Sequence, residues 1–396
     1  MTILNPIALE SNKQIKINFN GGHLSSDEGM LLIKEFAAKI GLIRLIKKLF
    51  KTNDHTTCRI HTDPDNLMQL VYQIIAAYFQ DDCADELKND PVLTTILEKD
   101  RLASQPTLSR FWNRMDQDTL AQFDRIHAKM REIVYSDRHP EHMLFDLDST
   151  LLNTYGSQEG EGFNFHYQAH GYHPLLCYDG LTGDLLKAEL RDGTQYCCKY
   201  AIRLKQNAAL LKYAEDADEA LYRATRENQI DYAVEYGEFE YQAGSWTHPR
   251  RVVCKVERPY GQMLHLFTFI VTTMESEPYQ VIQFYCGRGK MENFMKEGKT
   301  GFDFSSVSSH SKVVNANHLQ VHALAYNLFN WFRRLTLSTD MRKQRIDTIR
   351  LKLLKVAAKA VHSARYIVFK LCSSCPYKQE FYETLSNIQQ LQPQLE

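Results

Sequence analysis

Apolar residues recur at helical spacing through most of the first 140 residues. The segments with this pattern are 27–50, 66–80, 104–114 and 117–135. Gly41 interrupts the first of them, so two shorter helices are expected there. The run Asp137-Arg-His-Pro140 combines polar residues with a proline and ends the pattern. We therefore predict a mainly helical N-terminal region, residues 1–140.

The periodicity then changes to the alternation that is typical of strands. The segments predicted as strands are 142–148, 164–167, 175–178, 185–190, 200–204, 251–256 and 264–271. We expect the first of these to lie beside 185–190 and 164–167. Helical spacing returns after Gln280, over 280–297, 315–336 and 341–370. This order predicts a mixed α/β region, 141–310, with a β-rich insertion around 235–275, and a helical basic region, 311–396.

Composition places the chain among ordinary globular proteins. The apolar fraction is 44% and the charged fraction 24%, which excludes collagen-like and broadly disordered classes. No apolar run has the length of a membrane span, and the N-terminus does not resemble a secretory signal. Nine cysteines form an odd, sparse set, which favours a reducing cytoplasm over a disulfide framework.

Charge is unevenly distributed although the total is close to zero. Residues 331–370 contain eleven Lys or Arg against two Asp. Such a stretch fits a surface that faces a polyanion, and it equally fits an ordinary solvated helix face.

Two acidic residues stand two apart on the strand predicted at 142–148. Asp146 and Asp148 should therefore point to the same face of the sheet. Two carboxylates on one face repel each other unless a cation lies between them. A cation site and an exposed edge strand are both compatible with this pattern.

A second constellation lies in the predicted helix 280–297. Tyr285, Arg288, Glu292 and Lys299 are spaced so that they share one helix face, and Lys296 joins them. One carboxylate among cations suits a place where a metal ion and phosphate meet. A surface helix with internal ion pairs would show the same spacing.

This second constellation is the Tyr-x2-Arg-x3-Glu-x6-Lys signature of the insertion-sequence transposase class that includes the Tn-five enzyme. The chain resembles the thirteen-eighty insertion-sequence group of bacterial DDE transposases from about residue 17 to residue 340. The other segments that carry the resemblance are 78–82, 87–91, 103–110, 146–150, 155–160, 164–176 and 190–194.

The resemblance implies a ribonuclease-H-like core that binds two divalent ions, Mg²⁺ or Mn²⁺, and cleaves and joins DNA strands. Asp148 and Glu292 would be catalytic metal ligands, with Asp146 as an auxiliary acid. The partners would be double-stranded DNA, both terminal inverted repeats and target, bound by a cytoplasmic bacterial homodimer that contacts no membrane. The residues expected to contact DNA are Tyr285, Arg288, Lys296, Lys299, Arg203, Lys205, Arg342, Lys343 and Arg345.

The chain departs from the group at its second catalytic aspartate. Only nine residues separate Leu190 from Tyr200, whereas a parallel crossover needs a dozen or more. We therefore predict an internal deletion near Cys197-Cys198 that removes one strand–helix crossover unit and the second acid. The aspartates that remain nearby are Asp179, Asp184, Asp192, Asp216, Asp218 and Asp231; none lies in the Arg-x-Asp-Ser-Gly-Phe segment at the end of a central strand, where the group has its second acid.

Three functions are compatible with these observations. The first is a transposase, catalytically impaired by the missing segment. The second is a non-catalytic DNA-binding remnant or inhibitor of a full-length relative. The third is a nuclease or other DDE-like hydrolase, which the insertion-sequence motifs make less favourable.

Overall fold

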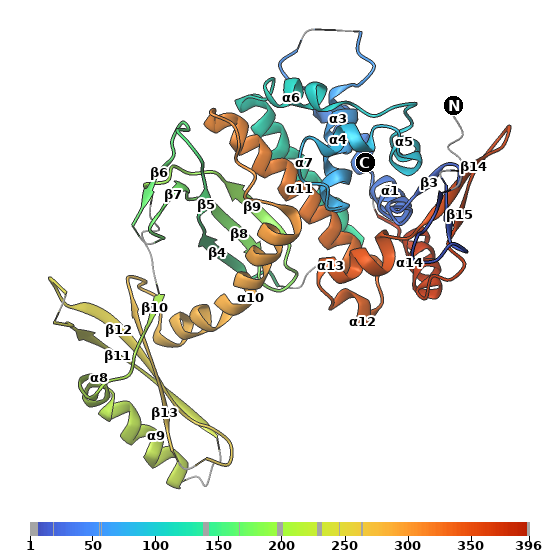
Figure 1. Cartoon of the computed structure of the whole chain (residues 1–396). Helices are drawn as coiled ribbons and strands as arrows, with labels where there is room; N and C mark the ends of the chain where they lie inside the picture. The colour runs from blue at the N-terminus through green and yellow to red at the C-terminus, as the bar shows by residue number, and fades with distance from the viewer. Residues whose placement is uncertain are drawn as a thin grey trace. The chain divides into compact units, whose positions relative to one another are not determined.

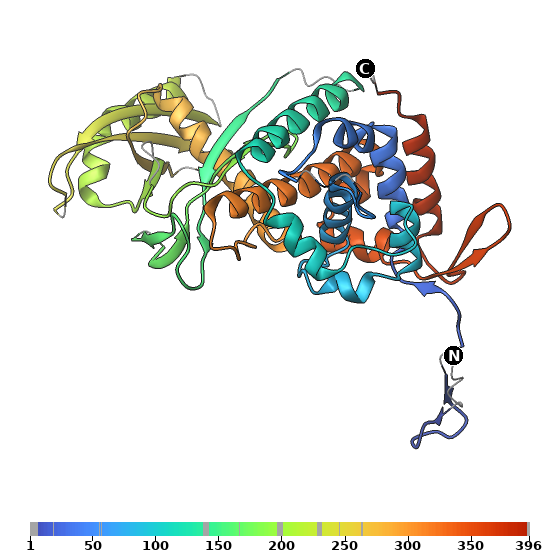
Figure 2. The same cartoon turned by 90° about the horizontal axis from the view of Figure 1, so that it is seen from above.

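A computed structural model describes residues 7–18, 20–54, 56, 58–137, 142–165, 167–195, 201–227, 232–244, 246–262 and 264–393 (Figures 1 and 2). The chain divides into two compact units. The first combines Met1–Thr194 with Phe294–Glu396, and the second is Gln195–Asn293.

The N-terminal part of the first unit is helical, as the apolar spacing predicts. Its helices are α1 (Met30–Lys39), α2 (Leu42–Leu49), α3 (Asp63–Ile75), α4 (Cys83–Leu87), α5 (Pro91–Leu97), α6 (Gln105–Trp112) and α7 (Gln117–Asp137). Gly41 separates α1 from α2 with a φ of 73°, a conformation that glycine adopts without a steric cost. A capping box between Thr62 and Asp65 starts α3.

The long helix α11 (Lys312–Thr336) runs through the middle of the first unit (Figures 1 and 2). Its buried residues include polar ones that hold neighbouring elements in place. Asn327 accepts a hydrogen bond from the Leu185 amide at 2.9 Å and donates one to the Leu185 carbonyl at 2.8 Å. Among the described helices, none is long and apolar enough to cross a bilayer.

A three-stranded antiparallel sheet lies in the same unit, with the order β4-β8-β9. The strands are β4 (Phe145–Ser149), β8 (Leu175–Asp179) and β9 (Leu185–Glu189). The prediction that β4 lies beside 185–190 and 164–167 is wrong, because β8 pairs with β4 and separates it from β9. Adjacent strands joined by a short turn pair most readily, and this places β8 against β9.

Short strands complete the first unit. β5 (Leu152–Asn153), β6 (Gly162–Asn164) and β7 (Ala169–Tyr172) form a small sheet in the order β5-β7-β6. β1 (Ile7–Ala8) pairs with β2 (Lys16–Ile17). β3 (Leu24–Ser25) joins a C-terminal hairpin described below.

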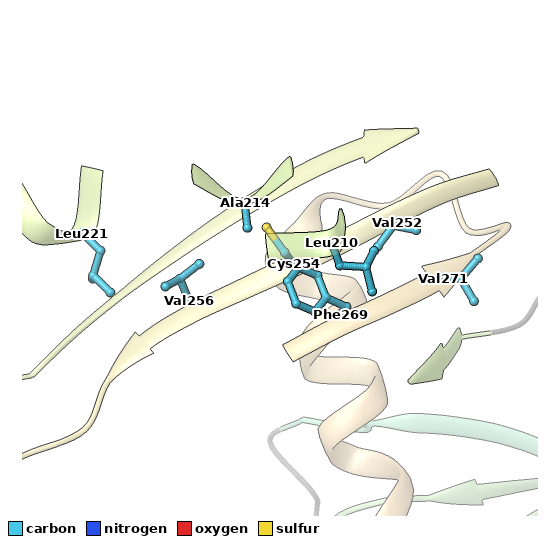
Figure 3. Close-up of a cluster of buried hydrophobic side chains, with 8 residues drawn as sticks. All are labelled: Leu210, Ala214, Leu221, Val252, Cys254, Val256, Phe269 and Val271. Atoms are coloured by element: carbon cyan, nitrogen blue, oxygen red, sulfur yellow. The ribbon is translucent and has the colours of Figure 1, made fainter. Parts of the chain in front are cut away.

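The second unit is a four-stranded antiparallel sheet with two helices. Its elements are β10 (Ala201–Leu204), α8 (Ala208–Tyr213), α9 (Glu215–Glu227), β11 (Ala233–Tyr241), β12 (Arg250–Arg258) and β13 (Leu266–Thr272). Leu210, Ala214 and Leu221 of the helices pack on β12 and β13 residues such as Val256 and Phe269 (Figure 3). α10 (Pro278–Phe302) starts in this unit and ends in the first.

The C-terminal region differs from the predicted continuous helix over 341–370. It contains α12 (Thr339–Arg342), α13 (Ile346–Ile349), a π-helix (Arg350–Leu354), strands β14 (Ala358–His362) and β15 (Ile367–Leu371), and α14 (Lys378–Gln390). The helical prediction is therefore wrong from residue 358 onward, and region 311–396 is only partly helical. Tyr366-Ile-Val-Phe369 is rich in residues that favour strands.

The start of α1 lies very close to the π-helix. The Gly29 amide donates to the Leu354 carbonyl at 3.2 Å. A Cβ at Gly29 would lie 1.9 Å from the Leu353 carbonyl oxygen, so only glycine fits. This close approach buries Glu28 completely.

We expect the Glu28→Gln substitution to change how stability depends on pH. Burial raises the pKa of Glu28 to about 7; backbone hydrogen bonds oppose this shift, and the negative charges of Asp90 and Asp27 add to it. Since the folded pKa exceeds the unfolded value, this carboxyl adds stability as pH falls through about 7. Between about pH 8 and 6 the wild type should gain about 1.4 kcal/mol relative to Glu28→Gln. Urea unfolding of both proteins measures this difference, and parallel pH profiles would contradict the expectation.

Candidate functional site

The acidic pair lies on β4 as the sequence predicts. Asp146 is 8% exposed and Asp148 is half-buried. Phe145, which precedes Asp146, and Leu147, which lies between the two acids, are exposed. Burial raises the pKa of Asp146, and the negative charge of Asp148 raises it further. The Ser149 amide donates to Asp148 Oδ1 at 2.8 Å. The two acids thus share one face and interact electrostatically.

The strand that carries these acids lies at the edge of its sheet. Among the described residues, β8 is the only strand that pairs with β4. Phe145 is 61% and Leu147 is 48% exposed, although apolar residues on a sheet face are usually covered. The apolar side chains on the face opposite the acids are therefore not covered by any packed element among the described residues.

Asp179 stabilises the turn between β8 and β9. Its Oδ1 accepts hydrogen bonds from the amides of Leu144 and Leu181, both at 3.1 Å. Its Oδ2 accepts one from the Thr182 hydroxyl at 2.6 Å. These contacts satisfy a carboxylate that is completely buried.

Asp184 holds three elements together. Arg334 of α11 donates to its Oδ2 at 2.7 Å, and the Tyr135 hydroxyl of α7 donates to the same oxygen at 2.9 Å. Asn330 donates to Oδ1 at 2.7 Å. Burial raises the pKa of Asp184, while the Arg334 guanidinium and these hydrogen bonds oppose that shift. The side chain is thus a structural ion-pair partner.

Neither of these acids is placed to share a metal ion with Asp148. Asp179 is the cross-strand partner of Phe145, three residues from Asp148. Three residues of strand span about 10 Å, whereas carboxylates that share a cation lie within a few ångströms of each other. Asp184 lies further along the chain, beyond the β8–β9 turn.

Asp192 lies beyond the end of β9 and pairs with Lys312 at 2.6 Å. Register places Ser149, Leu175 and Glu189 side by side, so Asp192 follows β9 at the end of the sheet where β4 also ends. Since β8 lies between them, the β4 and β9 backbones are two inter-strand spacings apart, about 10 Å. In the second unit, Asp218 pairs with His265 at 2.6 Å; Asp216 is exposed, and Asp231 lies outside the described residues.

The last part of α10 brings the signature lysine to the end of β4. Lys299 Nζ donates to the carbonyl of Leu151 at 2.8 Å, three residues after Asp148. Partial burial lowers the pKa of Lys299. Phe294 packs on Tyr178 with ring centroids 5.8 Å apart, so this part of α10 covers β8. Lys296 is exposed.

The earlier part of α10 belongs to the second unit. Tyr285 packs against that unit's cluster of Val253, Ile270 and Val281. Glu292 is exposed. Arg288 lies within the helix, but its side chain is outside the described part of the structure. Asp148 and Glu292 thus fall in different units, and their joint metal site stays a prediction.

The other residues predicted to contact DNA are exposed. Arg203 and Lys205 lie in and just after β10, and Arg342, Lys343 and Arg345 surround the junction of α12 and α13. Exposure leaves these cations available to a polyanion.

In the part of the chain that the structure describes, no three His, Cys, Asp or Glu side chains group so that they could hold a metal ion. In the first unit, the two carboxylates of Asp146 and Asp148 are therefore the candidate oxygen ligands for a metal ion. The residues described in that unit do not by themselves fit a centre for two divalent ions, which needs bridging carboxylates and further oxygen ligands.

Sequence reasoning did not assign the side chains that anchor β9 to α11. Gln320 donates to the Ala188 carbonyl at 2.6 Å, and with Asn327 it satisfies backbone groups on the outer edge of β9. Arg334 neutralises Asp184 beside them. The sequence feature that could have indicated these contacts is the series of Asn and Gln residues in the otherwise apolar helix 315–336. Buried amide side chains normally need hydrogen-bond partners.

Comparison with known proteins gives the family. A family model described as transposase DDE domain group 1 matches residues 7–199 and 194–393, so the chain belongs to this family of DDE-type transposases. The search of curated proteins returned no match. A piggyBac transposase synaptic complex with hairpin DNA is a structural neighbour at 10% identity and a TM-score of 0.36; the alignment covers 94% of this chain and 86% of that one.

Proposed function

We propose that this transposase binds the terminal inverted repeats of an insertion sequence and is impaired in metal-dependent strand cleavage and transfer. Membership of the DDE transposase family supplies the reaction class. In this proposal Asp148 is the first catalytic acid and Glu292 the last, with Asp146 as an auxiliary acid, on a ribonuclease-H-like core of the thirteen-eighty insertion-sequence group.

The observation that carries the proposal is that β4 has exposed apolar side chains and an unpaired edge among the described residues. The strand presents paired acids on one face and the exposed Phe145 and Leu147 on the other, and its second edge has no strand partner among the described residues. A central strand of an α/β sheet is covered on both faces and paired on both edges. The exposed apolar residues and open edge support the loss of one strand–helix unit beside β4.

The connection after β9 supports the same deletion. β9 ends at Glu189, and β10, which starts at Ala201, belongs to the antiparallel sheet of the second unit. The family model also matches as two segments that meet at residues 194–199. The second catalytic aspartate of the group belongs in the segment that is missing there.

The metal requirement follows from the family chemistry. Divalent ions would supply an activated nucleophile and stabilise the leaving oxygen. Asp148 and Glu292 would provide oxygen ligands, which suit Mg²⁺ or Mn²⁺. Without the second aspartate, the two-ion site of the group would lack one of its three acids.

DNA binding should be less affected than strand cleavage by the absence of the second aspartate. The residues proposed to contact the duplex are Tyr285, Arg288, Lys296, Lys299, Arg203, Lys205, Arg342, Lys343 and Arg345. Cations spread over a surface bind phosphates without a precise arrangement. We propose that a cytoplasmic bacterial homodimer binds transposon ends and target DNA in this way.

We expect the triple substitution Arg342→Ala, Lys343→Ala and Arg345→Ala to weaken binding of a duplex of about 30 base pairs on the order of 10- to 100-fold near 0.1 M salt. The slope of log affinity against log salt should fall by about 2 to 3, because each phosphate contact releases a counterion. Fluorescence anisotropy of the full chain over about 50 to 200 mM salt measures both quantities.

A matched control removes three cations from the acidic helix region α8–α9. The variant Lys212→Ala, Arg223→Ala and Arg226→Ala changes the net charge equally at exposed positions. It should alter the affinity only slightly. Wild-type binding that does not vary with salt would refute the electrostatic account.

A non-catalytic remnant or inhibitor is the second candidate function. The same open edge of β4 favours it, because a chain that binds ends without cutting them would occupy the substrate of an intact relative. Inhibition of such a relative by the purified chain, lost in the triple alanine variant, would support this function.

A further inference from the structure

The C-terminal hairpin β14–β15 carries an unbalanced positive charge. Residues 355–371 contain four Lys or Arg and no Asp or Glu. Lys355 is neutralised by Asp27 at 2.6 Å. For Lys359, Arg365 and Lys370, which are all exposed, the described part of the chain provides no ion-pair partner.

The register of the hairpin places two of these cations directly against each other. Lys359 is the cross-strand partner of Lys370, which brings their Cβ atoms to about 5 Å. Like charges in this position destabilise a hairpin in isolation. A polyanion that lies over the pair would convert this repulsion into attraction.

The hairpin is also free to enter a groove. Among the described residues, its base pairs with β3 through Ala358 and Lys359, and His23 just before β3 accepts a hydrogen bond from the Ala360 amide at 2.9 Å and contacts the His362 ring edge-on. Beyond Ala360 it is a two-stranded ribbon that extends away from the helices of its unit in both views (Figures 1 and 2). Tyr366, Ile367 and Val368 are 66%, 42% and 45% exposed.

We propose that the β14–β15 hairpin is a DNA-binding ribbon that lies in the major groove of the duplex, with Lys359 and Lys370 on backbone phosphates and Arg365 at the tip. This inference rests on the proposed function, because it assigns a contact surface for the same DNA. The major groove is about 12 Å wide and admits a two-stranded ribbon. Five-residue strands extend about 17 Å, which spans several phosphates.

The decisive variant is Lys370→Glu in the full chain. It replaces a like-charged cross-strand pair by an opposite-charged pair, so the melting temperature should stay equal or rise. Binding of a duplex of about 30 base pairs near 0.1 M salt should nevertheless weaken at least about tenfold. Loss of binding without loss of stability separates a contact with DNA from a folding defect.

The control is Lys212→Glu at the exposed end of α8 in the second unit. It changes the net charge by the same amount and should alter affinity less than about twofold. Equal effects of both variants would overturn the hairpin assignment, because net charge alone would then explain the loss.

The remaining outcomes also discriminate. If the wild type binds duplex DNA and Lys370→Glu binds as well, the hairpin proposal fails while the proposed function stands. If the wild type does not bind duplex DNA, both fail. If Lys370→Glu changes only the sedimentation coefficient and not the affinity, the ribbon contacts a second copy of the chain, and the hairpin proposal is overturned.

Discussion

Replacing Arg334 by alanine is expected to lower the free energy of unfolding by about 3–5 kcal/mol, the usual cost of removing one partner from a buried ion pair. Arg334 donates to Asp184 at 2.7 Å, and Asp184 is completely buried. The variant would leave a buried carboxyl that Tyr135 and Asn330 satisfy only in part. Urea unfolding monitored by circular dichroism gives the change in free energy.

An exposed ion pair on neighbouring elements provides the control. Lys187 of β9 pairs with Asp124 of α7 at 2.6 Å, and both side chains are about half exposed. Lys187→Ala should therefore cost less than about 1 kcal/mol. Similar losses in the two variants would contradict the structural role given to Asp184. Adding Asp184→Asn to Arg334→Ala should recover part of the loss, because no charge then remains buried.

Local periodicity was enough to predict α1, α2, α3, α6 and α7 of the N-terminal region and the strands of the first sheet, but not the short helices α4 and α5. The alternation around Asp146 and Asp148 correctly indicated two acids on one face. It could not indicate that β8 lies between β4 and β9, because strand order depends on contacts between distant segments. The same limit applies to the roles of Asp179 and Asp184, whose partners come from turns and from α7 and α11.

The C-terminal hairpin shows a different limit. Residues 341–370 combine helix-forming Lys, Arg, Leu and Ala with short β-branched runs. The helix-forming residues are more numerous, and for this reason the sequence predicts a helix over the whole segment. The structure places 358–362 and 367–371 in strands that pair with each other and with β3. Tertiary pairing thus overrides weak helix propensity where Val361, Ile367 and Val368 are available for cross-strand contact.

The largest expected functional effect concerns catalysis. Strand cleavage should be slower by at least about 10³-fold than in a relative that retains all three acids, because losing one preorganised electrostatic group already costs about 10²–10³ and losing a metal ion should cost more. The exposed Phe145 and Leu147 should also increase self-association. Single-turnover cleavage of the flanking transposon ends measures the defect.

The most direct test incubates purified chain and its Asp148→Ala variant with a supercoiled plasmid that carries the gene and its flanking DNA, in Mg²⁺ and separately in Mn²⁺. Gel-shift analysis of the same samples establishes that both proteins bind the ends. The account predicts that both bind and that neither cleaves above background over hours. Robust cleavage of the ends by the wild type, abolished in Asp148→Ala, would contradict it, because another residue would then replace the missing acid.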